Sequence, residues 1–480
     1  MSSVKAQPNI LFILVDQQRY DSLASSGHPL VKTPNLDRLA AQGVRFTRAY
    51  TACALSSPVR ASIMTGLYPH THQVLTNVHD YQSTLNLSPE HPTFATMLKE
   101  AGYRTGYSGK WHVAKTLGPQ AYGFDDVFTE NLGPRLESKC PPSNATWSRR
   151  TSDETVLTMP HGSLTVAGRL EEPKEVMQEH RALTHGLKFL RDYAGTPKQP
   201  FFLRVDFFGP HLPCIVPEPY ASMYKPEDVP DDPTFYDQFV GKPWIQKDMQ
   251  RRWGTDKLNW NDWRKVRARY YGYITMIDDY IGQLLAQLDQ SGLAENTLVI
   301  YSSDHGDACG SRGMVDKGYC GYEELYHVPM IARWPGVTHA GEVCDRFTNH
   351  VDLMPTFLQA GQCKVPQDMP QHGRSLIPLL EGKPPSNWPS YTVSEFHGMQ
   401  WGYYSQRIVR SERYKLVFNA TDLCELYDLE SDPWELTNRY EDPAMAAFAN
   451  NTSTTCWSGW NIHGIPSSEI CSGVVVMTRR

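Results

Sequence analysis

Short apolar runs alternate with longer amphipathic segments along most of the chain. The apolar runs have the length of buried strands, and they occupy residues 10–15, 44–50, 103–107, 200–207 and 297–301. The longer segments carry helix signals, either apolar residues three or four apart or a Pro start with a Gly stop. They occupy residues 33–43, 93–102, 175–194 and 260–291. This alternation predicts an α/β sandwich around a large, mostly parallel sheet.

Polar side chains directly follow four of the predicted strands. These side chains belong to Asp16, Lys110, His211 and Asp304. In open α/β sheets, ligands bind at the carboxyl ends of the strands. We therefore expect the four side chains to meet at one edge of the sheet and to form the functional site.

The stretch from Ser56 to Gly66 supplies a candidate nucleophile for this edge. Pro58 suits the first position of a helix, and Gly66 suits its end. Ser56 is therefore expected just before a helix N-terminus, where free N–H groups and the helix dipole favour an anion. Arg60, one turn into the helix, is expected to point back to the same place. An ordinary Ser-Pro helix cap explains this stretch alone equally well, and the strand-end residues favour the functional interpretation.

A Pro-rich segment near residue 385 divides the chain. Residues 383–389 form a predicted linker between a large α/β domain, residues 1–385, and a small α+β subdomain, residues 386–480. In the subdomain we expect short antiparallel strands and a helix near residue 444. The strands are expected at residues 391–396, 405–410 and 414–418. The less regular residues 117–198 and 217–259 are expected to surround the mouth of the site.

Composition excludes several classes of protein. The formal net charge of -6, with 20% charged residues, indicates neither a nucleic-acid-binding surface nor an acidic tail. No stretch approaches the ~18 apolar residues of a membrane span, and residues 10–15 suit a strand better than a signal peptide. We expect a cytoplasmic protein, or a periplasmic one if a leader was removed. The ten cysteines form no CxxC pair, so zinc-site spacing is absent and mostly buried free thiols are expected.

Two adjacent pairs at strand ends predict a metal site. Asp16 with Gln17, and Asp304 with His305, offer carboxylate, amide and imidazole ligands. Such ligands suit a hard divalent cation, Ca²⁺ in preference to Mg²⁺. Either pair alone is usually a turn or a helix cap. Two pairs at sheet ends, together with a candidate nucleophile at Ser56, favour the metal site.

Four further side chains have the chemistry of anion binding and proton transfer. Lys110 and Lys317 are compact cations that can hold the oxygens of a bound anion. His112 and His211 can transfer protons near neutral pH. A single Lys or His is usually a surface or core residue. These four are candidate site residues only because of their positions relative to the predicted strands.

Jointly, these motifs resemble the sulfatase family of the alkaline-phosphatase-like superfamily. The family signature is Cys or Ser, any residue, Pro, a small residue and Arg, followed by Thr-Gly. Residues 56–60 and 65–66 match it, with Val59 in place of the small residue. The other matches are Asp16-Gln17, Gly109-Lys110-Trp111-His112, Pro210-His211, Ser303-Asp304-His305-Gly306 and Lys317-Gly318. The resemblance covers residues 9–438 and implies an alkaline-phosphatase-like sandwich.

The resemblance also implies an activity and a role for each matching residue. Ser56 would be oxidised to formylglycine by a sulfatase-maturing enzyme, and the hydrate would attack the sulfur of a small or carbohydrate sulfate ester. The implied metal ligands are Asp16, Gln17, Asp304, His305 and the converted Ser56. Arg60 and His112 would steady the hydrate, and His112 would accept a proton. The implied sulfate-binding residues are Lys110, His211 and Lys317, with His211 or Lys317 assisting the leaving oxygen.

Other functions stay open at this point. A phosphonate monoester or phosphodiester hydrolase of the same superfamily is the nearest rival, and the complete set of two Lys and two His favours sulfate over it. A non-catalytic anion-binding relative fits if Ser56 stays a plain serine. Ser56 itself is either native or an introduced replacement of Cys, and a homo-oligomer is also left open. Four tryptophans could stack on a sugar, although such residues more often belong to the core: Trp244, Trp253, Trp260 and Trp263.

Overall fold

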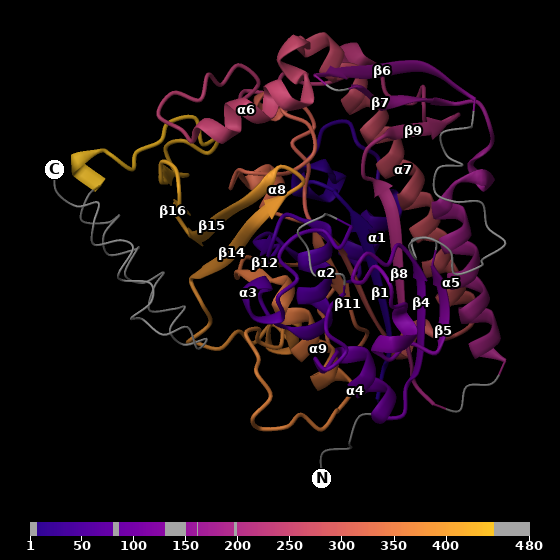
Figure 1. Cartoon of the computed structure of the whole chain (residues 1–480). Helices are drawn as coiled ribbons and strands as arrows, with labels where there is room; N and C mark the ends of the chain where they lie inside the picture. Colours follow the sequence, from indigo (N-terminus) through magenta and orange to yellow (C-terminus); the bar gives the residue numbers. More distant parts are fainter. Residues whose placement is uncertain (1–6, 80–85, 130–149, 161, 196–198, 446–480) are drawn as a thin grey trace.

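The computed structural model describes residues 7–79, 86–129, 150–160, 162–195 and 199–445 (Figure 1). Within these residues, eight strands form one central sheet. In spatial order they are β12 (Glu342–Cys344), β2 (Val44–Phe46), β11 (Met330–Arg333), β10 (Thr297–Ser303), β1 (Asn9–Asp16), β8 (Phe201–Pro210), β4 (Arg104–Gly109) and β5 (Asp126–Thr129). All neighbours from β10 to β5 are parallel, whereas β11 is antiparallel to both β10 and β2. The predicted mostly parallel sheet is confirmed.

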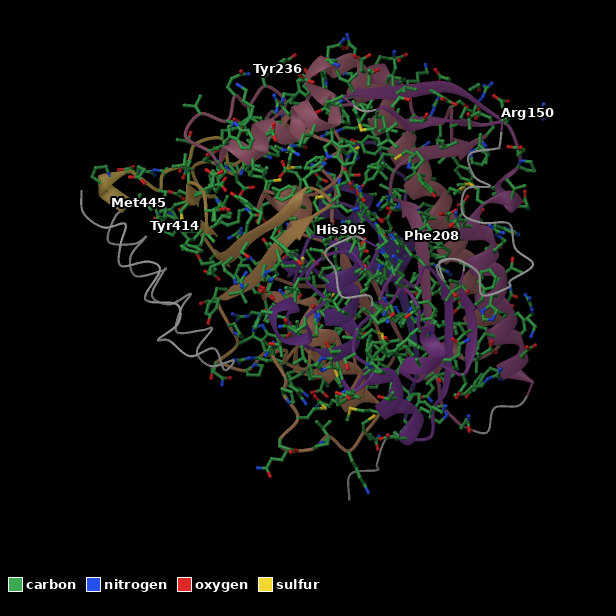
Figure 2. All side chains as sticks on the ribbon, in the orientation of Figure 1. Arg150, Phe208, Tyr236, His305, Tyr414 and Met445 are labelled. Carbon is green, nitrogen blue, oxygen red and sulfur yellow. The ribbon has the colours of Figure 1, made fainter. Side chains whose placement is uncertain are left out.

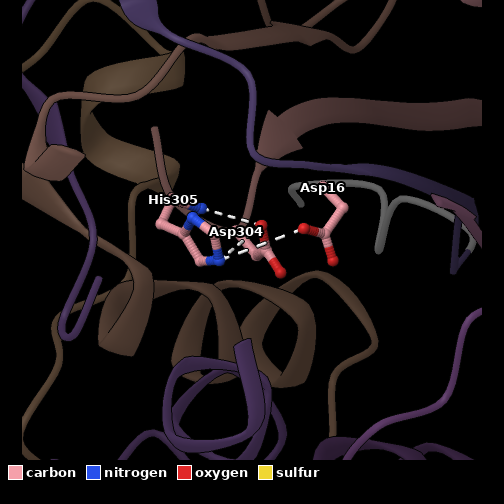
Figure 3. A group of neighbouring side chains, drawn as sticks. All are labelled: Asp16, Asp304 and His305. Atoms are coloured by element: carbon pink, nitrogen blue, oxygen red, sulfur yellow. Dashed lines mark hydrogen bonds and ion pairs between the residues drawn. The ribbon is translucent and has the colours of Figure 1, made fainter. Parts of the chain in front are cut away.

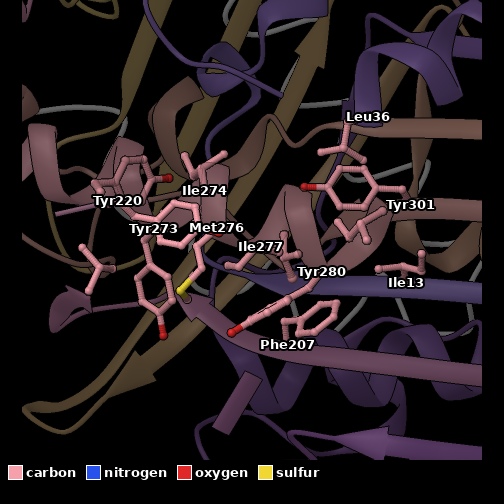
Figure 4. Close-up of a cluster of buried hydrophobic side chains, with 14 of the residues drawn as sticks. Ile13, Leu36, Phe207, Tyr220, Tyr273, Ile274, Met276, Ile277, Tyr280 and Tyr301 are labelled. Carbon is pink, nitrogen blue, oxygen red and sulfur yellow. The ribbon is translucent and has the colours of Figure 1, made fainter. Parts of the chain in front are cut away.

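Helices cover both faces of this sheet, and β1 shows why. Its odd-numbered apolar residues, such as Leu11 and Ile13, share one hydrophobic cluster with α1 (Pro34–Ala41), α5 (Gln178–Ala194) and α7 (Trp260–Gln290). Its even-numbered residues, such as Phe12, share a second cluster with α2 (Ser56–Thr65), α4 (Phe94–Glu100) and α9 (Leu353–Ala360). Side chains alternate between the faces of a strand, so a strand buried on both faces reads as one continuous apolar run. Figure 4 shows part of the first cluster, with Ile13 opposite Ile277 and Tyr280 of α7.

The long helix α7 is stabilised by its first turn and by its buried stripe. The Asn259 side chain accepts hydrogen bonds from the N–H groups of Asn261 and Asp262, and Asp262 accepts one from the N–H of Asn259. This capping box satisfies donors that would otherwise lack partners. The residues that predicted the helix are all buried: Val266, Tyr270, Tyr273, Ile277, Ile281, Leu284 and Leu288.

Three smaller sheets lie outside the central one in the described part of the chain, and two of them have more than two strands. One contains β6 (Thr151–Met159), β7 (Gly162–Leu170) and β9 (Cys214–Pro217). The other is antiparallel and contains β14 (Tyr391–Met399), β15 (Gly402–Ser411), β16 (Tyr414–Asn419) and β17 (Glu425–Asp428). The three strands predicted after residue 390 are confirmed. The helix expected near residue 444 is a single 3-10 turn, Pro443–Met445.

The C-terminal sheet shares a hydrophobic core with loops of the larger domain. Ile408, Val417 and Tyr427 of the sheet lie in one buried cluster with Tyr50 and Tyr322. The two predicted domains are therefore packed together through apolar side chains, and the boundary at residues 385 and 386 stays a prediction. The tail after residue 445 lies outside the described residues.

Three predictions of local structure were wrong. Residues 117–198, expected to be less regular apart from one helix, also contain the strands β5, β6 and β7. Residues 44–50 form two strands, β2 and β3 (Ala49–Tyr50), because the second leaves the central sheet and pairs with β13 (Thr348–Asn349). Residues 217–259 were expected to be loop-like but contain α6 (Trp244–Trp253). This helix buries Gln246 and Asp248 beside Met249, so polar residues interrupt the apolar pattern of its inner face. The remaining short helices are α3 (Pro69–His72), α8 (Glu323–Tyr326) and α10 (Ile377–Leu380).

The cysteines were expected to be free thiols, and no membrane span was expected. The described cysteines are all free thiols, and most of them are buried, as predicted for those positions. Every helix in the described ranges is too short or too polar to cross a lipid bilayer.

His72 makes the fold sensitive to acid. It lies at the end of α3, where its Nδ1 accepts a hydrogen bond from the N–H of Val74 at 3.1 Å and its Nε2 lies 3.0 Å from Ser62 Oγ. Burial lowers the pKa of His72 from 6.5 to about 3. Between these two values the unfolded chain binds a proton that the native site rejects, so stability is lost as the pH falls below 6.5.

We expect the free energy of unfolding to fall by about 2 kcal/mol more between pH 7 and pH 5 in the wild type than in a His72→Asn variant. The Asn Oδ1 replaces the Nδ1 acceptor without titrating. Urea unfolding at pH 7, 6 and 5 measures the difference, with the exposed His339→Asn as control. Equal pH slopes for the wild type and His72→Asn would contradict this role.

Candidate active site

Ser56 is the first residue of α2 and is buried at the carboxyl edge of the central sheet. Its Oγ lies 3.0 Å from His305 Nε2 and 3.4 Å from Asp16 Oδ2. The prediction placed Ser56 before the helix and Pro58 at its first position, but the helix begins two residues earlier. Pro58 is tolerated there because the N–H groups of the first turn have no partner inside the helix. Gly66 ends the helix in the left-handed region, at a φ of 67°, as expected.

Arg60 points back toward Ser56, as predicted. Its guanidinium forms ion pairs with Asp16 at 3.0 Å, Asp304 at 2.9 Å and Asp206 at 2.6 Å, and all four side chains are fully buried. Burial would lower the pKa of Arg60, but the three carboxylates raise it, so the guanidinium stays charged. Arg60 therefore fixes the two carboxylates that lie beside Ser56.

Asp16, Asp304 and His305 form a buried cluster that fits a divalent cation (Figure 3). One ligand atom of each lies within 4.8 Å of the others. Asp16 Oδ1 is buried without a hydrogen-bond partner among the described residues. His305 Nδ1 donates to the carbonyl of Gly306 at 2.9 Å, which leaves the Nε2 lone pair facing the cluster. An orphaned carboxylate oxygen and an oriented imidazole are what an oxygen- and nitrogen-binding cation requires. Figure 2 shows His305 near the centre of the molecule.

Gln17 touches this cluster through its backbone. Its N–H donates to Asp304 Oδ1 at 3.0 Å. Its side-chain amide donates to Asp307 Oδ2 at 2.8 Å, and its Oε1 accepts a hydrogen bond from Lys317 at 2.9 Å. The amide oxygen thus contacts the Lys317 ammonium, and its role as a metal ligand stays a prediction.

Two buried ammonium groups flank the cluster. Lys110 forms an ion pair with Asp16, and Lys317 forms one with Asp316 at 2.9 Å. Burial would raise the pKa of Asp16, but Lys110, His211 and Arg60 hold it well below its usual value. Gly109 allows the backbone conformation that brings Lys110 to this place. Its φ is 111°, and a Cβ at this position would lie 1.9 Å from the carbonyl oxygen of Asp206. That same oxygen accepts a hydrogen bond from the N–H of Lys110 at 3.0 Å.

His211 is a neutral imidazole joined to Lys317. Its Nδ1 donates to the carbonyl of Leu212 at 2.6 Å, and its Nε2 accepts a hydrogen bond from the Lys317 ammonium at 2.9 Å. Burial and the charge of Lys317 lower the pKa of His211 to about 4. Lys317 and His211 therefore share one proton at the edge of the site.

His112 is paired with a residue that the sequence did not single out. Its Nε2 lies 2.9 Å from His79 Nδ1, and the two rings stack at 5.0 Å. Burial, Lys110 and His79 lower the pKa of His112 well below its ordinary value. Arg60 lowers this pKa further, and Asp16 opposes the shift. No local pattern marks His79, which lies in a loop after α3.

Other residues of the site also went unpredicted. Asp206 binds Arg60 and accepts a hydrogen bond from the hydroxyl of Tyr107 at 2.9 Å. A signal was present in the sequence, since Arg204 and Asp206 are charged residues inside the otherwise apolar strand β8, and they pair at 2.7 Å. The predicted residues that follow β1, β4, β8 and β10 lie at this edge, because the four strands are neighbours in the sheet and parallel.

Comparison with known proteins agrees with this geometry. A sulfatase family model matches residues 8–362, and a model described as N-sulphoglucosamine sulphohydrolase, C-terminal, matches residues 310–456. An arylsulfatase of Clostridium perfringens is 30% identical, with 90% of each chain covered. The multifunctional alkaline phosphatase superfamily protein PehA of Trinickia caryophylli is 29% identical, with 92% of this chain and 93% of the relative covered.

Among solved structures, the phosphonate monoester hydrolase of Agrobacterium radiobacter superposes with a TM-score of 0.80. It is 27% identical, and the match covers 95% of this chain and 96% of that one. The family model spans most of the chain, and the fold is that of the alkaline-phosphatase-like proteins. The chain therefore belongs to the sulfatase family, a family of enzymes that hydrolyse sulfate esters.

Proposed function

We propose that this enzyme cleaves a small or carbohydrate sulfate ester at the Ser56 site, with Ser56 converted to formylglycine and one divalent cation beside it. The observation that carries the proposal is the position of Ser56 Oγ, 3.0 Å from His305 and 3.4 Å from Asp16. A nucleophile so close to metal-ligand chemistry and to buried cations suits attack on an anionic ester.

The proposed cation ligands are Asp16, Gln17, Asp304, His305 and the converted Ser56. Ca²⁺ suits this set better than Mg²⁺, because Mg²⁺ usually keeps several of its waters whereas these ligands are buried protein groups. When bound, the cation would supply positive charge where the nucleophile and the ester oxygens carry negative charge.

Formylglycine, as its hydrate, would carry two hydroxyl groups on one carbon. One hydroxyl would attack the ester, and the second is a group that a plain serine lacks. The protein's own groups take the other roles. Arg60 holds Asp16 and Asp304 in place beside Ser56. The neutral imidazole of His112 accepts a proton, since burial, Lys110 and His79 lower its pKa.

The substrate anion would be held by the buried ammonium groups of Lys110 and Lys317. Compact, desolvated cations stabilise negative charge on sulfate oxygens more strongly than solvated ones. The proton that Lys317 shares with His211 at 2.9 Å is available to the leaving oxygen. This pair supports general-acid assistance without requiring His211 itself to be protonated at neutral pH.

A phosphonate monoester or phosphodiester hydrolase is the alternative, because such an enzyme is among the similar structures. We expect kcat/KM for 4-nitrophenyl sulfate to exceed those for bis(4-nitrophenyl) phosphate and 4-nitrophenyl phenylphosphonate by at least about ten-fold. The four residues Lys110, His112, His211 and Lys317 favour the sulfate. The reverse order of rates would replace this proposal with the alternative.

Intact-mass measurement tests the modification separately. Conversion of Ser56 removes two hydrogens, so the protein produced with a sulfatase-maturing enzyme should be lighter by about 2 Da than the protein produced without one. An unchanged mass together with no turnover of any ester would indicate a non-catalytic anion-binding relative.

A further inference from the structure

A second cavity lies apart from the Ser56 site, where three distant segments of the chain meet. It has a volume of about 590 Å³, within the range of small-ligand pockets. Its walls are the C-terminal end of β6 with Pro160, the C-terminal end of α6 and the β14–β15 turn. Figure 1 shows α6 between β6 and the C-terminal sheet. The residues that carry the argument are Arg251, Arg252, Trp253, Gln400 and Trp401.

Two indole rings form an aromatic corner in this cavity. The rings of Trp253 and Trp401 meet edge to face, with centroids 5.5 Å apart and planes at 61°. Two apolar ring faces that meet at an angle suit the C–H face of a sugar.

The cavity also carries net positive charge. Asp248 pairs with both guanidinium groups, with Arg251 at 2.9 Å and with Arg252 through its other oxygen. One carboxylate balances only one of two guanidinium groups, so one positive charge and several N–H donors remain. The Arg252 guanidinium lies 5.4 Å from the centroid of the Trp401 ring. Guanidinium groups bind sulfate and carboxylate oxygens through two parallel hydrogen bonds, so the cavity favours an anionic sugar over a neutral one.

The walls of the cavity pack directly against the segment that carries Lys317. Trp401 stacks on Tyr319, with ring centroids 5.8 Å apart and planes at 11°. A Cβ at Gly318 would lie 2.6 Å from Met249 of α6 and 3.2 Å from Met399 of β14. The aromatic corner thus contacts Tyr319, which lies two positions after Lys317 in the chain.

We propose that this cavity is a subsite for a sugar residue that carries a sulfate or carboxylate and is linked to the sugar whose sulfate is cleaved. The proposal rests on the proposed function, and it makes the substrate an anionic oligosaccharide. Trp253 and Trp401 hold the sugar ring, and Arg251 and Arg252 hold its anionic group.

The first test compares two substrates in one set of variants. For Trp401→Ala and for Arg251→Gln, kcat/KM on a disaccharide with one sulfate on each sugar, divided by kcat/KM on 4-nitrophenyl sulfate, should fall at least about ten-fold. The probes are disulfated disaccharides derived from heparin and from chondroitin sulfate. Trp244→Ala and Lys247→Gln, exposed residues of α6 outside the cavity, are the matched controls. An unchanged ratio for both cavity variants overturns the proposal.

A binding measurement separates this inference from the proposed function. Calorimetric titration of a Ser56→Ala protein with the same disaccharides should show binding that Trp401→Ala weakens and Trp401→Phe retains. If such binding occurs while the unsubstituted enzyme hydrolyses no sulfate ester, the subsite stands and the proposed function fails. If the enzyme turns over 4-nitrophenyl sulfate but no disaccharide binds in a Trp401-dependent way, the subsite alone is refuted.

Discussion

Ser56→Ala should lower kcat/KM for sulfate esters by about 10⁴-fold or more. The variant loses the side-chain oxygen that lies 3.0 Å from His305 and 3.4 Å from Asp16. The helix should be unaffected, because Ser56 Oγ contacts the side chains of Asp16 and His305 and not the backbone N–H groups of the first turn. Single-turnover rates with 4-nitrophenyl sulfate measure the effect.

The neighbouring Ser57→Ala is the matched control for that experiment. Ser57 is buried in the same turn of α2, and its hydroxyl accepts a hydrogen bond from the N–H of Val78 at 3.2 Å. Its loss should cost about 1 kcal/mol of stability while turnover stays above that of Ser56→Ala by orders of magnitude. Comparable losses in both variants would show that the first turn of the helix, and not the Ser56 oxygen, is what matters.

Asp16→Asn should abolish stoichiometric metal binding and lower kcat/KM by at least about 100-fold. The substitution keeps the shape of the side chain but removes the charge that Arg60 and Lys110 share. It also leaves the Lys110 ammonium buried without its carboxylate, so the free energy of unfolding should fall by about 3 to 5 kcal/mol. Elemental analysis of the purified protein and urea unfolding measure the two effects.

The surface substitution Asp289→Asn, which breaks a pair with Arg38 at 3.5 Å, is the control for Asp16→Asn. Chelation of the unsubstituted enzyme should reproduce the loss of activity, and Ca²⁺ should restore it better than Mg²⁺. Full activity in a protein shown to contain no metal would refute the cation site.

Local sequence patterns predicted much of this architecture. The central residues of β1 and β10 form continuous apolar runs because both faces of the strands are buried. The sequence alone was enough to place Asp16 and Asp304 side by side, since parallel neighbours end at the same edge of a sheet. The Pro and Gly around α2 likewise indicated where Ser56 would lie.

What could not be predicted depends on contacts between distant segments. The helix α6 escaped notice because it buries polar residues, among them Gln246, which donates a hydrogen bond to Glu425 at 3.0 Å. His79 meets His112 only because a loop after α3 returns to the site. The cavity beside Trp401 joins three segments whose spacing in the sequence carries no periodic signal.

The core shared by the C-terminal sheet and the loops around the site has a consequence for protein engineering. Ile408, Val417 and Tyr427 interlock with Tyr50 and Tyr322, and Tyr322 lies only a few positions after Lys317 in the chain. A chimera that receives residues 391–428 from another family member would have new packing partners for these buried rings as well as new surface residues. Altering substrate preference by grafting would therefore require repacking beneath the graft, whereas point substitutions at the cavity surface would not.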